Sequence, residues 1–133
     1  MAFSSYNAKN TDLEIAGVSI TGLAEEFWSF SKREAYAEDS VGAVGDIVRN
    51  ERNDPIWDAE VTVQATSPQA KHLFSLAKRA EPFAIWCTDN VQLKRREGGS
   101  QALMNEAPED ARGTEAGELT FKFSVYDGEI INL

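Results

Sequence analysis

Two segments with strict alternation of apolar and polar residues constrain the fold most. Residues 58–66 read DAEVTVQAT and residues 118–126 read ELTFKFSVY, so every second side chain is apolar. A period of two places the apolar side chains on one face of a β-strand, whereas a helix repeats every 3.6 residues. Both segments are therefore predicted to be strands with one face in a core and the other outside it.

Shorter runs between turn-forming residues predict further strands. In residues 13–20 (LEIAGVSI) the parity of the apolar residues changes at Gly17, which predicts a bulge within one strand. Other strands are expected at 27–36, 44–50, 83–87, 91–94 and 101–106. Residues 37–43 read as the tip of a long hairpin, 95–100 as a charged loop, and 130–133 as a short apolar tail.

One helix is predicted to follow the strand at 58–66. Ser67 suits the N-cap, Pro68 suits the first helical position, and Pro82 ends the segment. Lys78 and Arg79 fall in its last turn, where cations suit the helix dipole. Spacings of i, i+3, i+4 and i+7 place four apolar residues on one buried stripe: Ala70, Leu73, Phe74 and Ala77. The whole predicts a mainly β, single domain over 1–133: a two-sheet β-sandwich or barrel with one packed α-helix and a long protruding β-hairpin.

Composition excludes several classes of function. The chain has 133 residues, one cysteine, one histidine and a formal charge of −9. One cysteine cannot form a disulfide within its own chain, and the negative charge argues against a sequence-reading nucleic-acid binder. No apolar run approaches the roughly 18–20 residues of a membrane span.

The residues that could carry catalysis are few. His72 lies on the predicted helix opposite Leu73, where it is expected to be an exposed surface histidine, and Cys87 ends an apolar run, where it is expected to be a small buried hydrophobe. Three carboxylate pairs, all in or beside predicted loops, lack the expected desolvation of an acid–base catalyst: Glu25-Glu26, Glu38-Asp39 and Glu109-Asp110. Lys94-Arg95-Arg96 is too short and isolated for a nucleic-acid patch. The prediction is no enzyme, no metal and no cofactor.

The order of the segments resembles the tail tube proteins of bacteriophages, especially the compact single-domain kind of contractile tails. The resemblance is carried by an opening strand with a glycine turn (IAGVSITGLA, 15–24), the far arm of the hairpin (VGAVGDIVRN, 41–50) and a strand running into a helix (AEVTVQATSP, 59–68). The run ALMNEAP (102–108) and the strand around Phe121 and Phe123 are similar too. Residues 130–133 (IINL) depart from the short glycine-containing end of the family.

This resemblance implies hexameric rings stacked into a tube that conducts genomic DNA without specific binding. It implies sheath, baseplate and tail-terminator partners, a place in the virion tail, and assembly in the host cytoplasm. The hairpin would reach the adjacent ring through Tyr36, Glu38, Asp39, Val41, Val44, Ile47 and Arg49. An acidic lumen would repel DNA phosphates, with Glu34, Asp46, Glu60 and Glu118 as candidate lumenal residues.

Two alternatives stay open from the sequence. A tube subunit of a contractile injection or secretion system would pass protein instead of DNA. A monomeric ligand-binding β-sandwich would need an exposed aromatic groove, yet most aromatics, including Trp28 and Phe30, fall on predicted core faces. Trp57, beside Pro55, is the exception and is a candidate interface residue. An enzyme ranks third and would need His72 or a loop acid to be buried.

Overall fold

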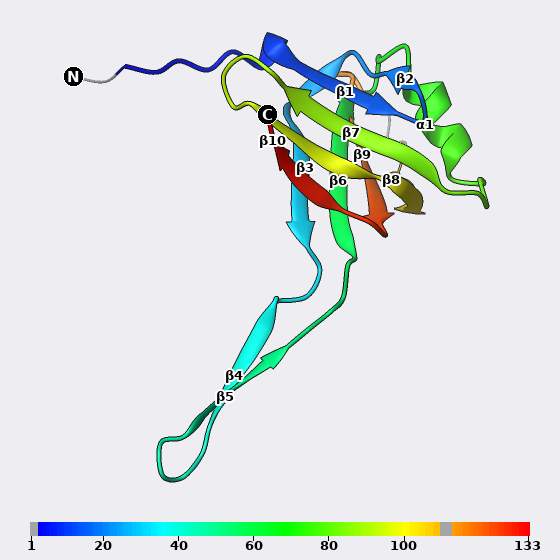
Figure 1. The fold of residues 1–133 in the computed structure, drawn as a ribbon. Helices are drawn as coiled ribbons and strands as arrows, with labels where there is room; N and C mark the ends of the chain where they lie inside the picture. The colour runs from blue at the N-terminus through cyan, green and yellow to red at the C-terminus, as the bar shows by residue number, and fades with distance from the viewer. Residues whose placement is uncertain (1–2, 110–112) are drawn as a thin grey trace.

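The computed structural model describes residues 3–109 and 113–133, and it confirms a mainly β fold with one α-helix and a protruding hairpin (Figure 1). The elements in chain order are η1 (Ala8–Asn10), β1 (Thr11–Ile15), β2 (Val18–Ser19), β3 (Leu23–Lys32), β4 (Ala37–Val41), β5 (Ile47–Glu51), β6 (Trp57–Gln64), α1 (Ala70–Leu76), β7 (Phe83–Asp89), β8 (Arg95–Glu106), β9 (Glu118–Val125) and β10 (Glu129–Asn132). No helix in these ranges is long and apolar enough to cross a membrane.

The strands form two antiparallel sheets. The larger has eight strands in the order β2-β1-β7-β8-β9-β6-β3, with β10 also paired to β8, and the smaller is the β4–β5 hairpin. Strand β8 joins two layers of the larger sheet. Its first half pairs with β7 and β10, and its second half pairs with β9. One continuous sheet therefore folds over itself to make the two layers, and the hairpin projects away from them (Figure 1).

The core lies between the two layers. Val61 and Phe121 from one layer and Ile15 and Ile85 from the other have no exposed surface. The rings of Phe83 and Phe123 meet edge to face across the core with centroids 5.9 Å apart. Helix α1 adds Leu73 and Leu76 to the same cluster. The alternating segments 58–66 and 118–126 are thus confirmed as neighbouring strands, β6 and β9, with their apolar faces inward.

The expected bulge at Gly17 is wrong, because the chain reverses there. Ile15 pairs with Val18, so β1 and β2 form a tight hairpin around Ala16 and Gly17, whose φ angles are 52° and 81°. Two central residues with positive φ make the type I′ turn that matches strand twist. The parity change in the sequence therefore marks a turn between two strands.

The predicted return strand 91–94 and loop 95–100 are also wrong. Residues 91–94 lie in the connection, and β8 begins at Arg95 and continues to Glu106. Gly98, at φ 137°, lies where a Cβ would overlap the Ile85 carbonyl of the paired strand β7. Gly98 thus allows β7 and β8 to approach each other closely. In the sequence, a glycine with this role cannot be distinguished from a glycine in a loop.

The helix is shorter than predicted and buries a different stripe. It spans Ala70–Leu76, with Leu73 and Leu76 buried, while Phe74 is half-buried and Ala77 is exposed. The Ser67 hydroxyl donates to the Thr21 carbonyl at 2.6 Å and accepts weakly from the Gln69 N–H at 3.4 Å. Because the helix ends at Leu76, the last position of the predicted stripe never faces the core.

The hairpin strands begin and end at other residues than predicted, and the C-terminal tail forms a strand. The hairpin turn lies at 42–46, where the Gly42 N–H donates to the Asp46 carbonyl at 2.8 Å, so the return strand is Ile47–Glu51. The strand expected at 27–36 is Leu23–Lys32. Residues of the apolar tail form β10, where Ile131 pairs with Arg96 of β8.

Candidate assembly surface

The β4–β5 hairpin exposes apolar side chains that contribute nothing to the core. Every residue of β5 is exposed, and at the tip Val41, Val44 and Ile47 are 68%, 92% and 70% exposed. Val41 faces Ile47 directly, and Val44 lies in the turn between them. The three aliphatic side chains therefore share the far end of the hairpin, which we call the apolar tip.

The other predicted hairpin residues lie along the same element. Tyr36 precedes β4, and the Lys32 ammonium lies 5.0 Å from its ring centroid. Asp39 faces Arg49, and Glu38 forms an ion pair with Arg52 at 3.0 Å. Both ion-pair partners are largely exposed, so the pair contributes little stability. The hairpin is thus held by its own ladder of backbone hydrogen bonds.

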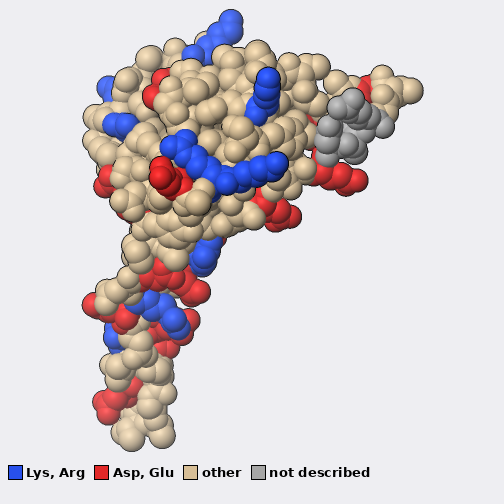
Figure 2. Space-filling model, turned by 90° about the vertical axis from the view of Figure 1, so that its right-hand side faces the viewer, with Lys and Arg blue, Asp and Glu red and all other residues tan. Residues whose placement is uncertain are grey.

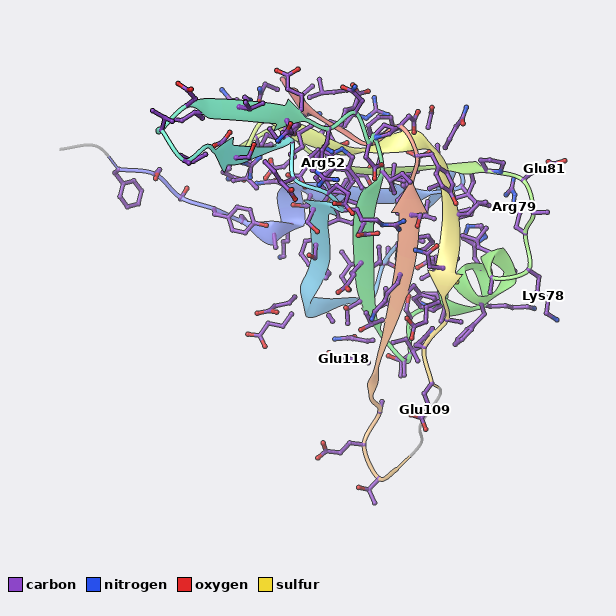
Figure 3. All side chains as sticks on the ribbon, turned by 90° about the horizontal axis from the view of Figure 1, so that it is seen from below. Arg52, Lys78, Arg79, Glu81, Glu109 and Glu118 are labelled. Atoms are coloured by element: carbon purple, nitrogen blue, oxygen red, sulfur yellow. The ribbon has the colours of Figure 1, made fainter. Side chains whose placement is uncertain are left out.

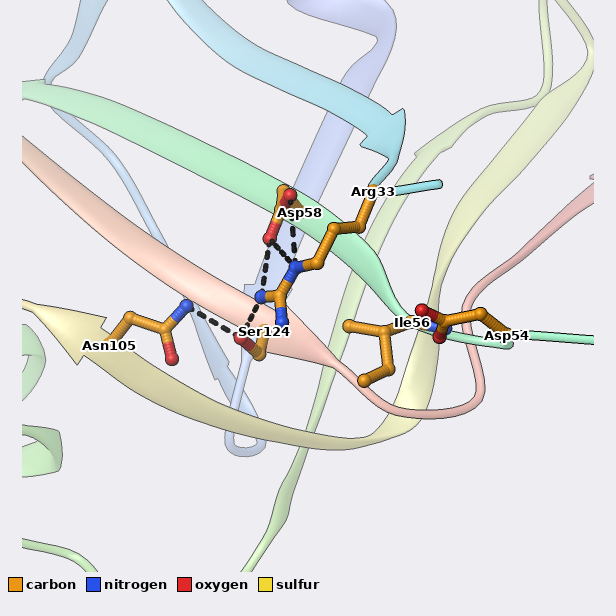
Figure 4. A network of polar contacts seen from close by, with 6 residues as sticks. All are labelled: Arg33, Asp54, Ile56, Asp58, Asn105 and Ser124. Atoms are coloured by element: carbon orange, nitrogen blue, oxygen red, sulfur yellow. Dashed lines mark hydrogen bonds and ion pairs between the residues drawn. The ribbon is translucent and has the colours of Figure 1, made fainter. Parts of the chain in front are cut away.

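A polar network fixes the root of the hairpin (Figure 4). Arg33, directly after β3, binds Asp58 of β6 at 2.8 Å and the Ser124 hydroxyl of β9 at 2.7 Å. The Asn105 side chain donates to the same hydroxyl at 2.5 Å. The hydrogen bond to Asp58, opposed by burial, raises the pKa of Arg33. One guanidinium therefore links the start of the hairpin to the strands that support it, and sequence reasoning missed this role.

A polar sheet face extends from this root across β6 and β9. Because the apolar side chains of both strands point inward, the alternate ones point outward: Asp58, Glu60, Thr62 and Gln64 on β6, and Glu118, Thr120, Lys122 and Ser124 on β9. The Thr62 and Thr120 hydroxyls lie 3.1 Å apart across the strands. Lys122 approaches Glu106 at 3.7 Å. We call this surface the polar sheet face.

The structure brings together two of the four predicted lumenal acids. Glu60 and Glu118 are both exposed on the polar sheet face. Figure 3 shows Glu118 beside the loop that joins β8 to β9, away from the hairpin and its Arg52. Glu34 lies at the hairpin root and Asp46 lies in the hairpin turn. All four side chains are exposed, and of the four only Glu60 and Glu118 lie on the polar sheet face.

The catalytic candidates from the sequence lie on different elements of the fold. No group of three metal-binding side chains is present in these ranges. His72 is half-buried rather than exposed, because its Nε2 lies 3.1 Å from the Ile15 carbonyl. Glu25-Glu26 and Glu38-Asp39 lie within strands β3 and β4 rather than in loops, and their side chains are exposed. Glu109 is exposed, and Asp110 lies outside the described residues.

Aromatic rings form a stack on β3 and β6 that joins Trp28 and Phe30, which were expected on core faces, to Trp57, the candidate interface residue. Trp28, Phe30 and Trp57 are half-buried, with Trp28–Phe30 centroids 5.7 Å apart and Phe30–Trp57 centroids 4.6 Å apart. Gly128 packs against Trp57 so closely that a Cβ there would overlap the indole. Trp57 is therefore partly covered by its own chain.

Cys87 is buried on β7, as expected for a small hydrophobe, and burial raises the pKa of its thiol to about 12. Against an ordinary value of 9.0, the thiolate fraction at pH 8 falls roughly a thousandfold. We predict that iodoacetamide at pH 8 leaves the folded protein unmodified and alkylates Cys87 in guanidinium. Mass spectrometry of timed samples measures both rates, and alkylation of the folded protein at the unfolded rate would contradict this account.

Comparison with known proteins finds similarity in fold but not in sequence. No protein family model and no curated protein matches the sequence. Solved structures do match in fold. The structure described as the anti-feeding prophage cap, or AFP tube terminating cap, has a TM-score of 0.65 and 10% identity, over 100% of this chain and 95% of that chain.

Two further solved structures come from an extracellular contractile injection system. The PVC sheath-tube complex in the extended state gives a TM-score of 0.61 and 13% identity, covering 92% of this chain and 88% of that chain. The PVC sheath/tube terminator in the extended state gives 0.63 and 11%, covering 98% and 99%. At these identities the likeness shows a shared fold over nearly the whole chain.

Proposed function

We propose that this chain is a structural, non-catalytic tube-type subunit of a contractile tail or injection apparatus. The observation that carries the proposal is the hairpin. It projects a solvent-exposed apolar tip from a fold shared, end to end, with chains of tube, cap and terminator assemblies. A fixed root with an unburied apolar end is what a contact between subunits requires.

Ring stacking gives the apolar tip a partner. The hairpin of one subunit inserts against the adjacent ring and buries Val41, Val44 and Ile47. Contacts between different surfaces of identical subunits propagate as open filaments. Within a ring, neighbouring sheets pair edge to edge, which covers strand edges that would otherwise template aggregation. In the phage form of this proposal, six subunits make each ring.

The polar sheet face is the proposed lumen wall. Its outward side chains are hydroxyls, amides and carboxylates, with Glu60 and Glu118 among them. Such a wall carries few cations for phosphates to bind, so DNA would pass without being retained. A tube of an injection system would use the same wall for protein cargo. Sheath, baseplate and terminator contacts then fall on the outer surface and at the two ends.

A second candidate is a tube-terminating cap. Two of the solved structures are described as a cap and a terminator, and they match over 95% and 99% of their own length. A cap forms one ring on the tube end and does not propagate. The two candidates differ in whether the purified protein polymerises into tubes or stops at a single ring.

Electron microscopy of the purified protein, with light scattering on the same sample, tests the proposal. Hollow tubes with sixfold symmetry support a tube subunit, and single rings that bind the end of a preformed tube support a cap. A monomer of about 15 kDa that stays single even with tail-tip components would overturn both, given the chain mass of 14.7 kDa.

The lumen assignment makes a separate prediction. We expect Glu60→Lys with Glu118→Lys to permit assembly and to slow DNA ejection about tenfold, because lysines lining the wall would bind phosphates. Ejection kinetics of assembled particles at two salt concentrations measure the effect, which salt should weaken. The control is Glu14→Lys, an exposed acid on β1 in the other layer. Unchanged ejection would show that the polar sheet face lies outside the lumen.

A further inference from the structure

A groove with a volume of about 550 Å³ lies between β3 and the opposite layer formed by β1, β7 and β8. Aromatic and aliphatic side chains line it, including Trp28, Phe30 and Leu93. Its charged lining consists of four acids and one cation: Glu25, Glu26, Asp89, Glu97 and Arg95. We call it the acidic groove. Acids over an aromatic surface suit a cationic side chain.

One carboxylate in the acidic groove is buried with half its hydrogen-bonding capacity unused. Asp89 is 3% exposed, and its Oδ1 accepts from the backbone N–H groups of Val91 at 2.8 Å and Gln92 at 3.1 Å. Its Oδ2 is buried and has no donor among the described residues. Burial would raise the pKa of Asp89, but the turn N–H groups outweigh it and hold that pKa below its ordinary value. The group is thus an ionised carboxylate whose Oδ2 lacks a donor among the described residues.

Arg95, the cation among the residues that line the groove, lies against Glu97 and not against Asp89. Glu97 accepts from the Trp28 indole N–H at 2.8 Å and lies 3.7 Å from the Arg95 guanidinium. Glu25 and Glu26 remain exposed on the rim, in the bulged part of β3. The groove therefore keeps an excess of negative charge with an apolar floor.

The opposite side of the two-layered domain carries the complementary charge. The loop between α1 and β7 presents Lys78 and Arg79, both exposed, far from β3 and the groove (Figures 1 and 3). Figure 2 shows Lys and Arg side chains gathered on this side of the molecule. The Arg79 guanidinium lies 5.7 Å from the Phe83 ring centroid, which leaves Lys78 as the more extended of the two cations. We call residues 77–82 the basic loop, which also contains Glu81 and has a net charge of +1.

We propose that the acidic groove of one copy receives the basic loop of a second copy, with Lys78 pairing with the exposed rim carboxylates Glu25 and Glu26. The inference rests on the proposed function, since it names the lateral contact within a ring. A loop on one side that fits a groove on the other makes a heterologous contact, and repeating that contact closes a ring when the rotation per subunit allows. Charge complementarity between two surfaces of one sequence favours a second copy as the occupant.

Paired charge reversals test the contact. Lys78→Glu with Arg79→Glu, and separately Glu25→Lys with Glu26→Lys, should each keep the fold and weaken association at least tenfold by sedimentation. An equimolar mixture of the two variants should regain association, because each reversed surface then meets its complement in alternating order. Lys122→Glu, an exposed reversal on the polar sheet face, is the control and should associate like the native chain. Unweakened single variants, or no recovery in the mixture, would overturn the proposal.

Cross-linking separates this inference from the proposed function. Glu26→Cys and Lys78→Cys chains are mixed and treated with a short bis-maleimide, with Cys87 shielded by burial. Cross-linked dimers between the two variants, but not within either variant alone, are expected. Rings in the microscope without cross-links would overturn the groove contact and leave the proposed function standing. Cross-links without rings or tubes would support the contact and overturn the tube assignment. The absence of both cross-links and rings would overturn both proposals.

Discussion

Replacing residues 38–45 with a short Gly-Ser turn is expected to leave the domain folded and to abolish ring stacking. The side chains of 38–45 are exposed, and the Arg33 network that fixes the root lies outside the replaced segment. The replacement removes most of β4 and leaves β5 without its partner strand, but it removes no side chain of the core. Thermal unfolding measures the first expectation, and electron microscopy at matched protein concentration measures the second.

A subtler variant separates the length of the hairpin from its chemistry. Val44→Ser with Ile47→Ser keeps every backbone hydrogen bond of the hairpin and removes two aliphatic side chains of the apolar tip. We expect it to shorten tubes and to raise the concentration at which they form. Long tubes from the Gly-Ser variant would show that stacking uses another surface, and the hairpin assignment would then be abandoned.

Phe121→Ala is expected to lower the free energy of unfolding by about 3–5 kcal/mol. Phe121 has no exposed surface, lies on the central strand β9, and meets Phe74 of α1 edge to face at 5.2 Å. Its removal leaves a cavity between the helix and both layers, which the surrounding strands cannot fill without breaking their register. Urea unfolding measures the loss as a shift of the midpoint at constant slope.

The neighbouring position supplies the control for this variant. Lys122→Ala changes an exposed side chain whose nearest ionic partner, Glu106, is 3.7 Å away and also exposed. Its expected cost is at most about 1 kcal/mol. A loss below 1 kcal/mol for Phe121→Ala would show that the centre of the core is elsewhere.

The parts of the fold that follow from local pattern were predictable. The alternation in 58–66 and 118–126 identified the two central strands and their inward faces, because one buried face imposes a period of two. The hairpin was also predictable, since residues 37–43 lack a clean period and contain turn formers, although the turn itself lies at 42–46. The pairing of distant strands was not predictable, because the register between β6 and β9 depends on pairs 54 to 68 residues apart in the sequence.

Two of the errors had a common physical origin in glycine. Gly17 and Gly98 both interrupt apolar patterns, and the sequence does not distinguish a turn, a bulge and a close approach of two backbones. In the fold Gly17 lies in a hairpin turn, while Gly98 lies inside a strand pressed against Ile85. The unpaired oxygen of Asp89 could not be predicted from the sequence either. Its Oδ1 accepts hydrogen bonds only because residues 89–92 fold into a turn, and the same fold leaves Oδ2 buried without a donor among the described residues.

The sharing of β8 between two layers has a consequence for how the chain matures during synthesis. The partner of β1 is β7, some 70 residues later, and β6 lacks one neighbour until β9 has been made. A nascent chain that ends before residue 118 therefore holds one layer with an open side, exposing apolar surface to other chains. Since such distant pairings close slowly, the final collapse follows translation of β9. The two layers then close in one cooperative step, whereas the β4–β5 hairpin pairs strands that are close in sequence and does not depend on β9.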